Sequence, residues 1–315
     1  MCQRLVTARA LERISVGNAA GLVSTPEEIE YACGNNGLTE VTIGPITLRM
    51  RPGNSGSTYT YDPETHNSVN SRGLPNKGLP WYLENIRQIY RRAHTNGKRV
   101  RASIVGLEPG EFGKLAQSLR YAGVDEIELN FGCPNVWSLD GTQKPILSYD
   151  PAAVKEVLAE VRAAVGTGIP IAVKISPVPD DILEPLVTVI IESEIVTKVV
   201  GVNTWPNTRL KISGRPALRF KPHGATEESP WLDAGGGGGT ILREHRRRVV
   251  RYLANHLPVG MKVIAVGCIF DGTDALEALQ DGAHGFQIGT AYAEFGGPHA
   301  IDTILSGLSQ LVPGD

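Results

Sequence analysis

The stretch Ile171-Ala172-Val173-Lys174-Ile175-Ser176 is a short, mostly apolar and β-branched run, and an amphipathic stretch follows it from Asp180 to Ser193. The first pattern predicts a buried strand and the second predicts a helix. The same unit recurs along the whole chain. Strands are predicted at 14–23, 40–46, 99–105, 126–130, 198–203, 262–266 and 284–288. Helices are predicted to start at 25 and after 150, and to span 81–94, 111–121, 240–256, 273–280 and 300–311.

Strict alternation of strands and helices predicts parallel strands joined by helical crossovers. The count of eight favours a closed (β/α)₈ TIM barrel over a doubly wound open sheet, which is the alternative α/β arrangement. A chain of 315 residues is long for one domain, but barrels often reach this size. We therefore expect one barrel domain over residues 1–315.

Three connections are too long to be simple turns: residues 47–80, 131–149 and 204–239. Each follows a predicted strand, so in a barrel all three lie at the carboxyl ends of the strands, where barrel enzymes place their active sites. Long loops without secondary structure are usually functional. The sequence therefore predicts the position of the site before any motif is considered.

Composition excludes several classes of function. The net charge of −2 provides no basic field for nucleic acid or anionic lipid, and Arg246-Arg247-Arg248 is predicted to be a solvated helix face. The four cysteines, Cys2, Cys33, Cys133 and Cys268, form no CxxC pair, which argues against a zinc ribbon or an iron–sulfur cluster. No stretch is long and apolar enough to cross a bilayer. These features predict a soluble, cytoplasmic protein without a metal.

Cys133 is the first candidate catalytic residue. It lies three residues after the strand that ends at Asn130, between Gly132 and Pro134, whose backbone geometry can hold it over the barrel mouth. A thiol has an ordinary pKa of about 8.5, close enough to neutrality for a general base. A buried structural cysteine is the alternative interpretation.

Amide side chains and one lysine form the second group of candidates. Asn70, Asn130, Asn135 and Asn203 follow strands or lie in the long loops. Asparagine offers donors and an acceptor without charge, which suits a ring that carries amides and carbonyls. Lys174 ends its strand and is predicted to point into the mouth, where a cation would stabilise negative charge on a reduced flavin.

Glycines after the last strands suggest a phosphate site. Gly267-Cys268 follows the seventh strand and Gly289-Thr290 follows the eighth, where barrels commonly bind phosphate through backbone N–H groups. The run Gly235–Gly239, which includes Gly238 and Gly239, directly precedes a predicted helix and could add further amides as a loop. A flexible linker is the alternative for that run.

The chain resembles the dihydroorotate dehydrogenases, especially the soluble class 1A type, over nearly its whole length. The resemblance rests on motifs in matching order rather than on any one motif. The matching segments are Gly17-Asn18-Ala19-Ala20-Gly21, Asn70-Ser71-Arg72-Gly73-Leu74-Pro75-Asn76, Leu129-Asn130-Phe131-Gly132-Cys133-Pro134-Asn135, Val173-Lys174, Gly201-Val202-Asn203-Thr204, Lys221-Pro222 and Gln287-Ile288-Gly289-Thr290.

The resemblance implies a flavoprotein oxidoreductase of pyrimidine biosynthesis that binds FMN, forms a homodimer and uses fumarate as electron acceptor. It implies that Cys133 takes a proton from C5 of dihydroorotate while C6 delivers hydride to the flavin. The residues implied for substrate binding are Asn70, Leu74, Asn130, Asn135, Asn203 and Thr204. The residues implied for FMN are Ala19, Ala20, Gly21, Asn130, Lys174, Gly238, Gly239, Gly267, Cys268, Gly289 and Thr290.

Several positions depart from the family pattern. After the second strand the family has a lysine that contacts flavin and substrate, but here Ile43 or Gly44 occupies its place. Ser55-Gly56-Ser57-Thr58 replaces a segment that usually contains proline and arginine, the loop after Asn135 is longer, and Cys268 replaces a glycine. A lost charged hydrogen bond is worth roughly 1.5–3 kcal/mol. A relative that acts on another cyclic amide or an unsaturated acid is therefore the main alternative.

Two other functions fit parts of the pattern. Dihydrouridine synthases also carry an asparagine–x–glycine–cysteine–proline stretch, but the net charge of −2 argues against an RNA substrate. A degenerate barrel could also serve as a scaffold without catalysis. The flavin content of the purified protein separates that reading from the enzymatic ones.

Overall fold

The computed structural model describes residues 6–34, 37–137 and 142–312. Eight parallel strands close into a barrel in the order β1-β16-β15-β9-β8-β7-β6-β2, so the chain has the predicted (β/α)₈ fold and the open-sheet alternative is wrong. The barrel strands are β1 (Ser15–Asn18), β2 (Glu40–Ile46), β6 (Arg99–Ile104), β7 (Glu126–Asn130), β8 (Ile171–Ile175), β9 (Val196–Gly201), β15 (Lys262–Val266) and β16 (Gly285–Ile288).

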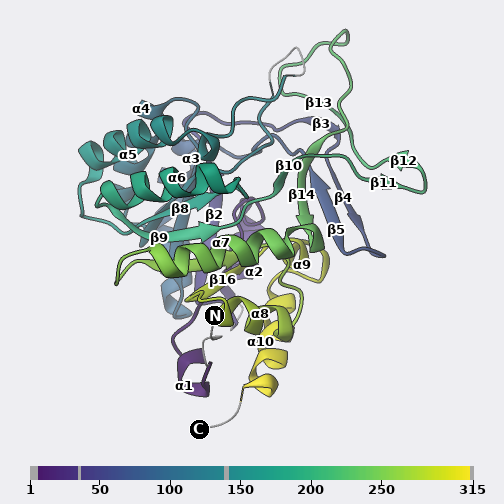
Figure 1. The fold of residues 1–315 in the computed structure, drawn as a ribbon. Coiled ribbons are helices and arrows are strands. Elements are labelled where there is room, and N and C mark those ends of the chain that lie inside the picture. Colours follow the sequence, from purple (N-terminus) through teal and green to yellow (C-terminus); the bar gives the residue numbers. More distant parts are fainter. Residues whose placement is uncertain (1–5, 35–36, 138–141, 313–315) are drawn as a thin grey trace.

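Helices pack around the outside of the barrel, as Figure 1 shows. They are α2 (Pro26–Gly34), α3 (Leu79–Thr95), α4 (Pro109–Ala122), α5 (Pro151–Val165), α6 (Asp180–Glu192), α7 (Arg243–His256), α8 (Gly272–Gln280) and α10 (Pro298–Leu311). Short helices α1 (Ala8–Leu11) and α9 (Thr290–Glu294) and single turns η1 (Leu147–Tyr149) and η2 (Thr240–Leu242) complete them. The first predicted strand was too long, since only residues 15–18 pair in the barrel, and α9 was not predicted.

Helix starts follow their capping chemistry. The backbone N–H of Glu28 donates to Thr25 Oγ1 at 3.3 Å, and Glu28 Oε2 accepts from the Thr25 N–H at 3.0 Å, which is a reciprocal capping box. At α5, Asp150 Oδ1 accepts from the N–H groups of Ala152 and Ala153. These side chains satisfy the first N–H groups of each helix, which have no partner inside the helix.

The side chains of β7 explain how one strand serves two environments. Ile127 and Leu129 are fully buried in the layer between barrel and helices, as period-2 alternation requires. Glu126, Glu128 and Asn130 are also buried, but they alternate with those two and so face the barrel interior. Glu126 therefore lies at the amino-terminal end of the barrel interior, which we call the floor, and Asn130 lies at the carboxyl-terminal end, the mouth.

The floor of the barrel is a balanced cluster of four buried charges. Arg101 contacts Glu40 and donates through Nε to Glu126 at 2.6 Å, and Lys198 Nζ donates to Glu40 at 3.0 Å and to Glu126 at 2.5 Å. Although burial alone would raise the pKa of Glu40, Arg101 and Lys198 lower it to about 2. The carboxylate of Glu40 therefore stays charged, with Arg101 and Lys198 as its partners.

The long connections are not unstructured, which is a correction to the sequence prediction. Residues of the first and third form a four-stranded sheet in the order β10 (Trp205–Thr208), β14 (Gly235–Gly239), β5 (Asn67–Asn70) and β4 (Tyr59–Asp62). Two smaller pairs join β11 (Lys211–Ile212) to β12 (Arg215–Pro216) and β13 (Arg219–Lys221) to β3 (Ser55–Ser57). In Figure 1 these strands gather at one end of the molecule, away from α1 and the end of α10.

The run Gly235–Gly239 is strand β14, not the loop or linker that its composition suggested. It is buried and pairs antiparallel with β5 from Gly236↔Asn70 to Gly239↔Asn67. A Cβ at Gly235 would lie 2.3 Å from the Asn70 carbonyl oxygen, and one at Gly237 would lie 2.4 Å from Thr208 Oγ1. The neighbouring strands approach so closely that these positions require glycine, and the low β propensity of glycine does not prevent the strand.

The arginine run on α7 is a second correction. Arg246 is fully buried, contacts Glu277 and donates to the carbonyl oxygen of Cys268 at 2.6 Å. Arg248 contacts Asp180 at the start of α6. Arg247 pairs with Glu277 and Asp281, so all three guanidinium groups of this run bind neighbouring elements and none is a free solvated side chain.

Candidate active site

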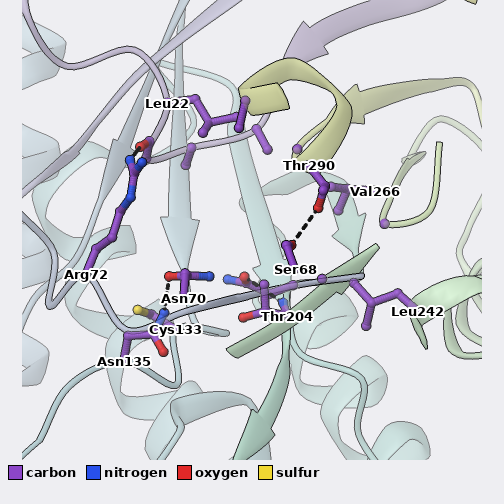
Figure 2. Close-up of a pocket in the computed structure, with 18 of the residues that line it drawn as sticks. Leu22, Ser68, Asn70, Arg72, Cys133, Asn135, Thr204, Leu242, Val266 and Thr290 are labelled. Carbon is purple, nitrogen blue, oxygen red and sulfur yellow. Dashed lines mark hydrogen bonds between the residues drawn. The ribbon is translucent and has the colours of Figure 1, made fainter. Parts of the chain in front are cut away.

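A cavity opens at the carboxyl ends of the barrel strands, under the four-stranded sheet (Figure 2). The space inside its lining is about 1140 Å³, a figure that includes open solvent at the mouth. All the site residues predicted from the sequence line this one cavity. They are Ala19, Ala20, Gly21, Asn70, Leu74, Asn130, Cys133, Asn135, Lys174, Asn203, Thr204, Gly238, Gly239, Gly267, Cys268, Gly289 and Thr290.

Cys133 is positioned by the backbone that follows β7. Asn130 Oδ1 accepts from the Gly132 N–H at 3.2 Å, and the Phe131 N–H donates to the Lys174 carbonyl oxygen at 2.9 Å. A Cβ at Gly132 would lie 2.8 Å from Asn203 Cβ, so a side chain there would displace the neighbouring wall. The turn therefore needs glycine immediately before the thiol.

Electrostatics around Cys133 work in opposite directions. Burial raises the pKa of the thiol, while a hydrogen bond from the Asn135 backbone and the charges of Lys174 and Arg51 lower it, with burial the largest effect. The thiol is therefore a weaker acid than an exposed cysteine. It is half-buried and faces the cavity rather than the packed interior.

The four predicted asparagines form two hydrogen-bonded pairs. Asn135 Nδ2 donates to Asn70 Oδ1 at 2.6 Å, and Asn203 Nδ2 donates to Asn130 Oδ1 at 3.1 Å. The Gly236 N–H donates to Asn135 Oδ1 at 3.0 Å, which ties the first pair to β14. Each amide keeps further donor or acceptor capacity, so the pairs are fixed in place without being saturated.

Lys174 connects the cavity to the barrel interior. Its ammonium group donates to Gln287 Oε1 at 3.3 Å, and Gln287 Nε2 donates to Glu128 Oε2 at 2.7 Å. Burial lowers the pKa of Lys174, and the carboxylate of Glu128 opposes that effect. The lysine thus lies buried at the inner end of the cavity, and Gln287 connects it to the carboxylate of Glu128.

The far wall is built from small residues. Ser68 Oγ and Thr290 Oγ1 lie 2.9 Å apart, and a Cβ at Gly238 would lie 2.7 and 3.0 Å from these two oxygens. The next loop along the barrel rim is held by Arg246, which binds the carbonyl oxygens of Gly267 and Cys268. Burial is the largest of the influences that raise the pKa of the Cys268 thiol to about 11, so it stays protonated.

Sequence reasoning missed several lining residues, of which Arg72, Tyr59 and Ser68 are polar. Arg72 lies inside a quoted motif, but nothing in its neighbourhood predicted that its side chain would turn into the cavity. Tyr59 and Ser68 belong to strands that were predicted to be loop. The extra sheet therefore hid these residues from a reading based on the barrel strands alone.

The predicted loss of a lysine after β2 has a clear structural counterpart. Ile43 is fully buried in the main apolar core and does not line the cavity. Pro45, which follows Gly44, is the β2 residue that reaches the cavity wall. The end of β2 thus contributes no charge. The lengthened loop after Asn135 includes residues 138–141, which lie outside the described part of the chain, as does Cys2.

Within the described residues, no group of three or more histidine, cysteine or acidic side chains could hold a metal ion. No helix of that part of the chain is both long and apolar enough to cross a membrane.

The fold and the site define a class: barrel enzymes whose thiol, amides and buried lysine converge at the strand carboxyl ends. The family model for dihydroorotate dehydrogenase matches residues 12–312, and the chain belongs to that family of oxidoreductases. It is similar to the catalytic subunit of dihydroorotate dehydrogenase B (NAD(+)) of Methanocaldococcus jannaschii, with 30% identity over 277 residues, covering 86% of this chain and 81% of the relative.

Two further relatives are named dihydroorotate dehydrogenase A (fumarate). The protein of Lactococcus lactis subsp. lactis is 30% identical over 299 residues, covering 94% of this chain and 89% of its own length. The protein of Lactococcus lactis subsp. cremoris shows the same identity over the same length and coverage. The resemblance inferred from the motifs is therefore confirmed at the level of the family.

Proposed function

We propose that the protein is an FMN-dependent dihydroorotate dehydrogenase, which oxidises dihydroorotate to orotate in pyrimidine biosynthesis. The observation that carries this proposal is the convergence of Cys133 and the asparagines on one cavity. Family membership and the names of the relatives support the reaction.

The cavity suits FMN. Glycine at position 238 leaves room beside Ser68 and Thr290 that a Cβ would fill, and Thr204 Oγ1 is buried with no hydrogen-bond partner among the described residues. The backbone of Ala19–Gly21 and the rim residues 267–268 and 289–290 would hold the flavin and its phosphate. Bound FMN would supply the acceptor for the hydride that leaves the substrate.

The chain's own residues account for the rest of the chemistry. Cys133, as thiolate, would take the proton from the substrate carbon beside the ring carbonyl. The asparagine pairs would hold the ring amides and carbonyls in register with that sulfur. Lys174, fixed through Gln287 to Glu128, would place a positive charge at the inner end of the cavity.

A second candidate is an oxidoreductase of the same family that acts on a different cyclic amide or an unsaturated acid. The specific observation behind it is the end of β2, where buried Ile43 and Pro45 contribute no cation.

The electron acceptor and assembly are further proposals that rest on the relatives. Two of these relatives are named for fumarate and one for NAD(+). We propose fumarate, the acceptor for which two of these relatives are named. We also propose a cytoplasmic homodimer, to be checked by light scattering.

An anaerobic flavin-reduction assay tests the function directly. Dihydroorotate should bleach the flavin absorbance of the purified protein, and fumarate should restore it. A panel of related ring amides, run beside dihydroorotate, separates the two candidates. If another ring compound bleaches the flavin and dihydroorotate does not, the second candidate replaces the first. A folded protein that contains no flavin would contradict both.

A further inference from the structure

Arg72 is a charged residue of the cavity wall that the mechanism above does not use. It lies in the connection between β5 and α3, is half-buried and lines the cavity. Its Nη1 donates to the Gly21 carbonyl oxygen at 3.2 Å, and its guanidinium carbon lies 5.4 Å from the centre of the Tyr59 ring. Across residues 6–34, 37–137 and 142–312 it forms no ion pair, so its charge has no acidic partner there.

The position of the guanidinium group matters because of what it adjoins. The Gly21 N–H donates to the Gly44 carbonyl oxygen at 2.8 Å, while the Gly21 carbonyl oxygen accepts from Arg72. One residue of backbone therefore separates the guanidinium group from the end of β2. That is the part of the wall where β2 itself supplies no charge. Arg72 brings a cation to it from a different loop.

The other two cations near the site are placed differently. Lys174, the second cationic side chain among the lining residues, is directed to Gln287 and Glu128. Arg51 donates through Nε to the Gly73 carbonyl oxygen at 3.2 Å and does not line the cavity. In Figure 2, Arg72 lies on the same side of the view as Cys133, Asn70 and Asn135, its side chain extends away from Cys133 in the direction of Leu22, and Thr290, Val266 and Leu242 lie on the other side.

We propose that Arg72 binds the carboxylate of the substrate and so makes the enzyme select ring amides that carry an acid group. A guanidinium group presents five N–H donors in a planar fork, and its single bond to Gly21 leaves enough of them for a two-point contact with a carboxylate. Stacking near Tyr59 holds the group in position without neutralising it. This inference rests on the proposed function. It adds the residue that makes the enzyme prefer ring substrates with a carboxylate over neutral ones.

The test compares matched acid and neutral ligands in Arg72→Met, Arg72→Lys and Arg219→Met. Orotate and uracil differ by the carboxylate, and binding of each is followed by perturbation of the flavin spectrum. Arg219 is the control, because it also stacks on an aromatic ring, 4.1 Å from the centre of Trp231, but lies outside the cavity lining. Flavin content and thermal unfolding show whether each variant is folded.

Arg72→Met should weaken orotate binding about 10- to 150-fold, the range that a charged hydrogen bond supports, and change uracil binding less than about twofold. Arg72→Lys should recover part of the loss, and Arg219→Met should bind both as wild type does. An unchanged preference for orotate in Arg72→Met would overturn the inference. So would a shift in flavin potential with orotate binding intact, since Arg72 would then act on the cofactor.

The two possible failures are distinguishable. A wild-type flavin that dihydroorotate does not reduce contradicts the proposed function. In that case, the inference about Arg72 is tested with other ring amides that bind, each compared with and without a carboxylate. The inference fails if the wild-type protein does not bind the carboxylated member of each pair more tightly. If dihydroorotate reduces the wild-type flavin and Arg72→Met reacts equally well at low substrate concentration, only the inference fails.

Discussion

At the scale of single residues, the site depends on a thiol whose surroundings oppose its ionisation. Burial raises the pKa of Cys133, and the charges of Lys174 and Arg51 only partly offset this. A thiol with a raised pKa is mostly protonated at neutral pH, but the small fraction of thiolate is a strong base. The enzyme therefore depends on a small thiolate fraction, and two measurements follow from that.

Substitution of the thiol is the first. Cys133→Ser should slow flavin reduction by the true substrate by about 10²- to 10⁴-fold, the usual contribution of a positioned base. Flavin binding should be unaffected, because the substitution keeps the volume nearly constant. Stopped-flow absorbance under anaerobic conditions measures the rate. The control is Cys33→Ser on α2, a fully buried cysteine remote from the cavity; a comparable loss of rate there would refute the assignment.

The pH dependence is the second. Protonated thiol cannot accept a proton, so the reduction rate should fall tenfold for each pH unit below the pKa of Cys133. Because burial raises that pKa, the rate should climb steadily from pH 6 to at least about 8.5, the ordinary thiol value. Reduction rates in a pH series check this. A plateau that begins near pH 7 would mean that the positive charges outweigh burial.

The residue scale also shows where sequence reasoning stops. The motif around Asn130 and Cys133 correctly predicted the position of both residues at the cavity, since a strand end fixes where its next residues lie. Arg72 was not predicted, because the direction of a loop side chain depends on contacts with Gly21 and Tyr59 that sequence does not reveal. The buried Arg246 was misjudged for the same reason: its partner Glu277 lies on another helix.

At the scale of elements, β-branched runs predicted the barrel strands well, and β2, β7 and β15 match their predicted ranges. The strands over the cavity were missed because they are short and polar, or consist of glycine. Strand β14 pairs with β5 and β10, and its residues are glycine because Asn70, Thr208 and Ser68 lie too close for any side chain. Such a strand is specified by its surroundings, and local pattern carries no signal for it.

A substitution in β14 tests this view. Gly238→Ala would place a Cβ 2.7 Å from Ser68 Oγ and 3.0 Å from Thr290 Oγ1, on the wall of the cavity. Overpacking of this kind should cost about 1–3 kcal/mol and reduce flavin content of the purified protein. Gly110→Ala is the control, since no atom lies within 4 Å of its Cβ and α4 tolerates alanine. Equal flavin retention in both variants would show that β14 does not shape the site.

At the scale of the whole molecule, the barrel interior combines polar side chains with a small apolar cluster that includes Ala172, Val200 and Ile264. Glu126, Glu128 and Asn130 on β7 mark the floor, the middle and the mouth of the interior. The floor cluster joins β2, β6, β7 and β9. The alternation of strands and helices predicted closure of the barrel, but not these charges, which read from sequence as exposed residues. Their partners come from strands far apart in the chain, so only the closed barrel pairs them.

The floor cluster provides the last prediction. Lys198→Met leaves the carboxylates of Glu40 and Glu126 with Arg101 alone, and an uncompensated buried charge should lower the free energy of unfolding by about 3–5 kcal/mol. Arg162→Met removes an exposed pair with Glu194 and should cost less than about 1 kcal/mol. Urea unfolding at pH 7 measures both. Similar values for the two variants would show that the floor charges contribute little to stability.

The effect of Lys198→Met should also depend on pH with a definite sign. The folded pKa of Glu40, about 2, lies below the ordinary glutamate value of about 4.3. Its contribution to stability is therefore present above the ordinary value and disappears as pH falls through about 2. Because Lys198 helps to lower that pKa, the stability difference between wild type and variant should shrink as the pH falls below about 4. A difference that stays constant from pH 7 to pH 3 would show that Lys198 acts by packing rather than by charge.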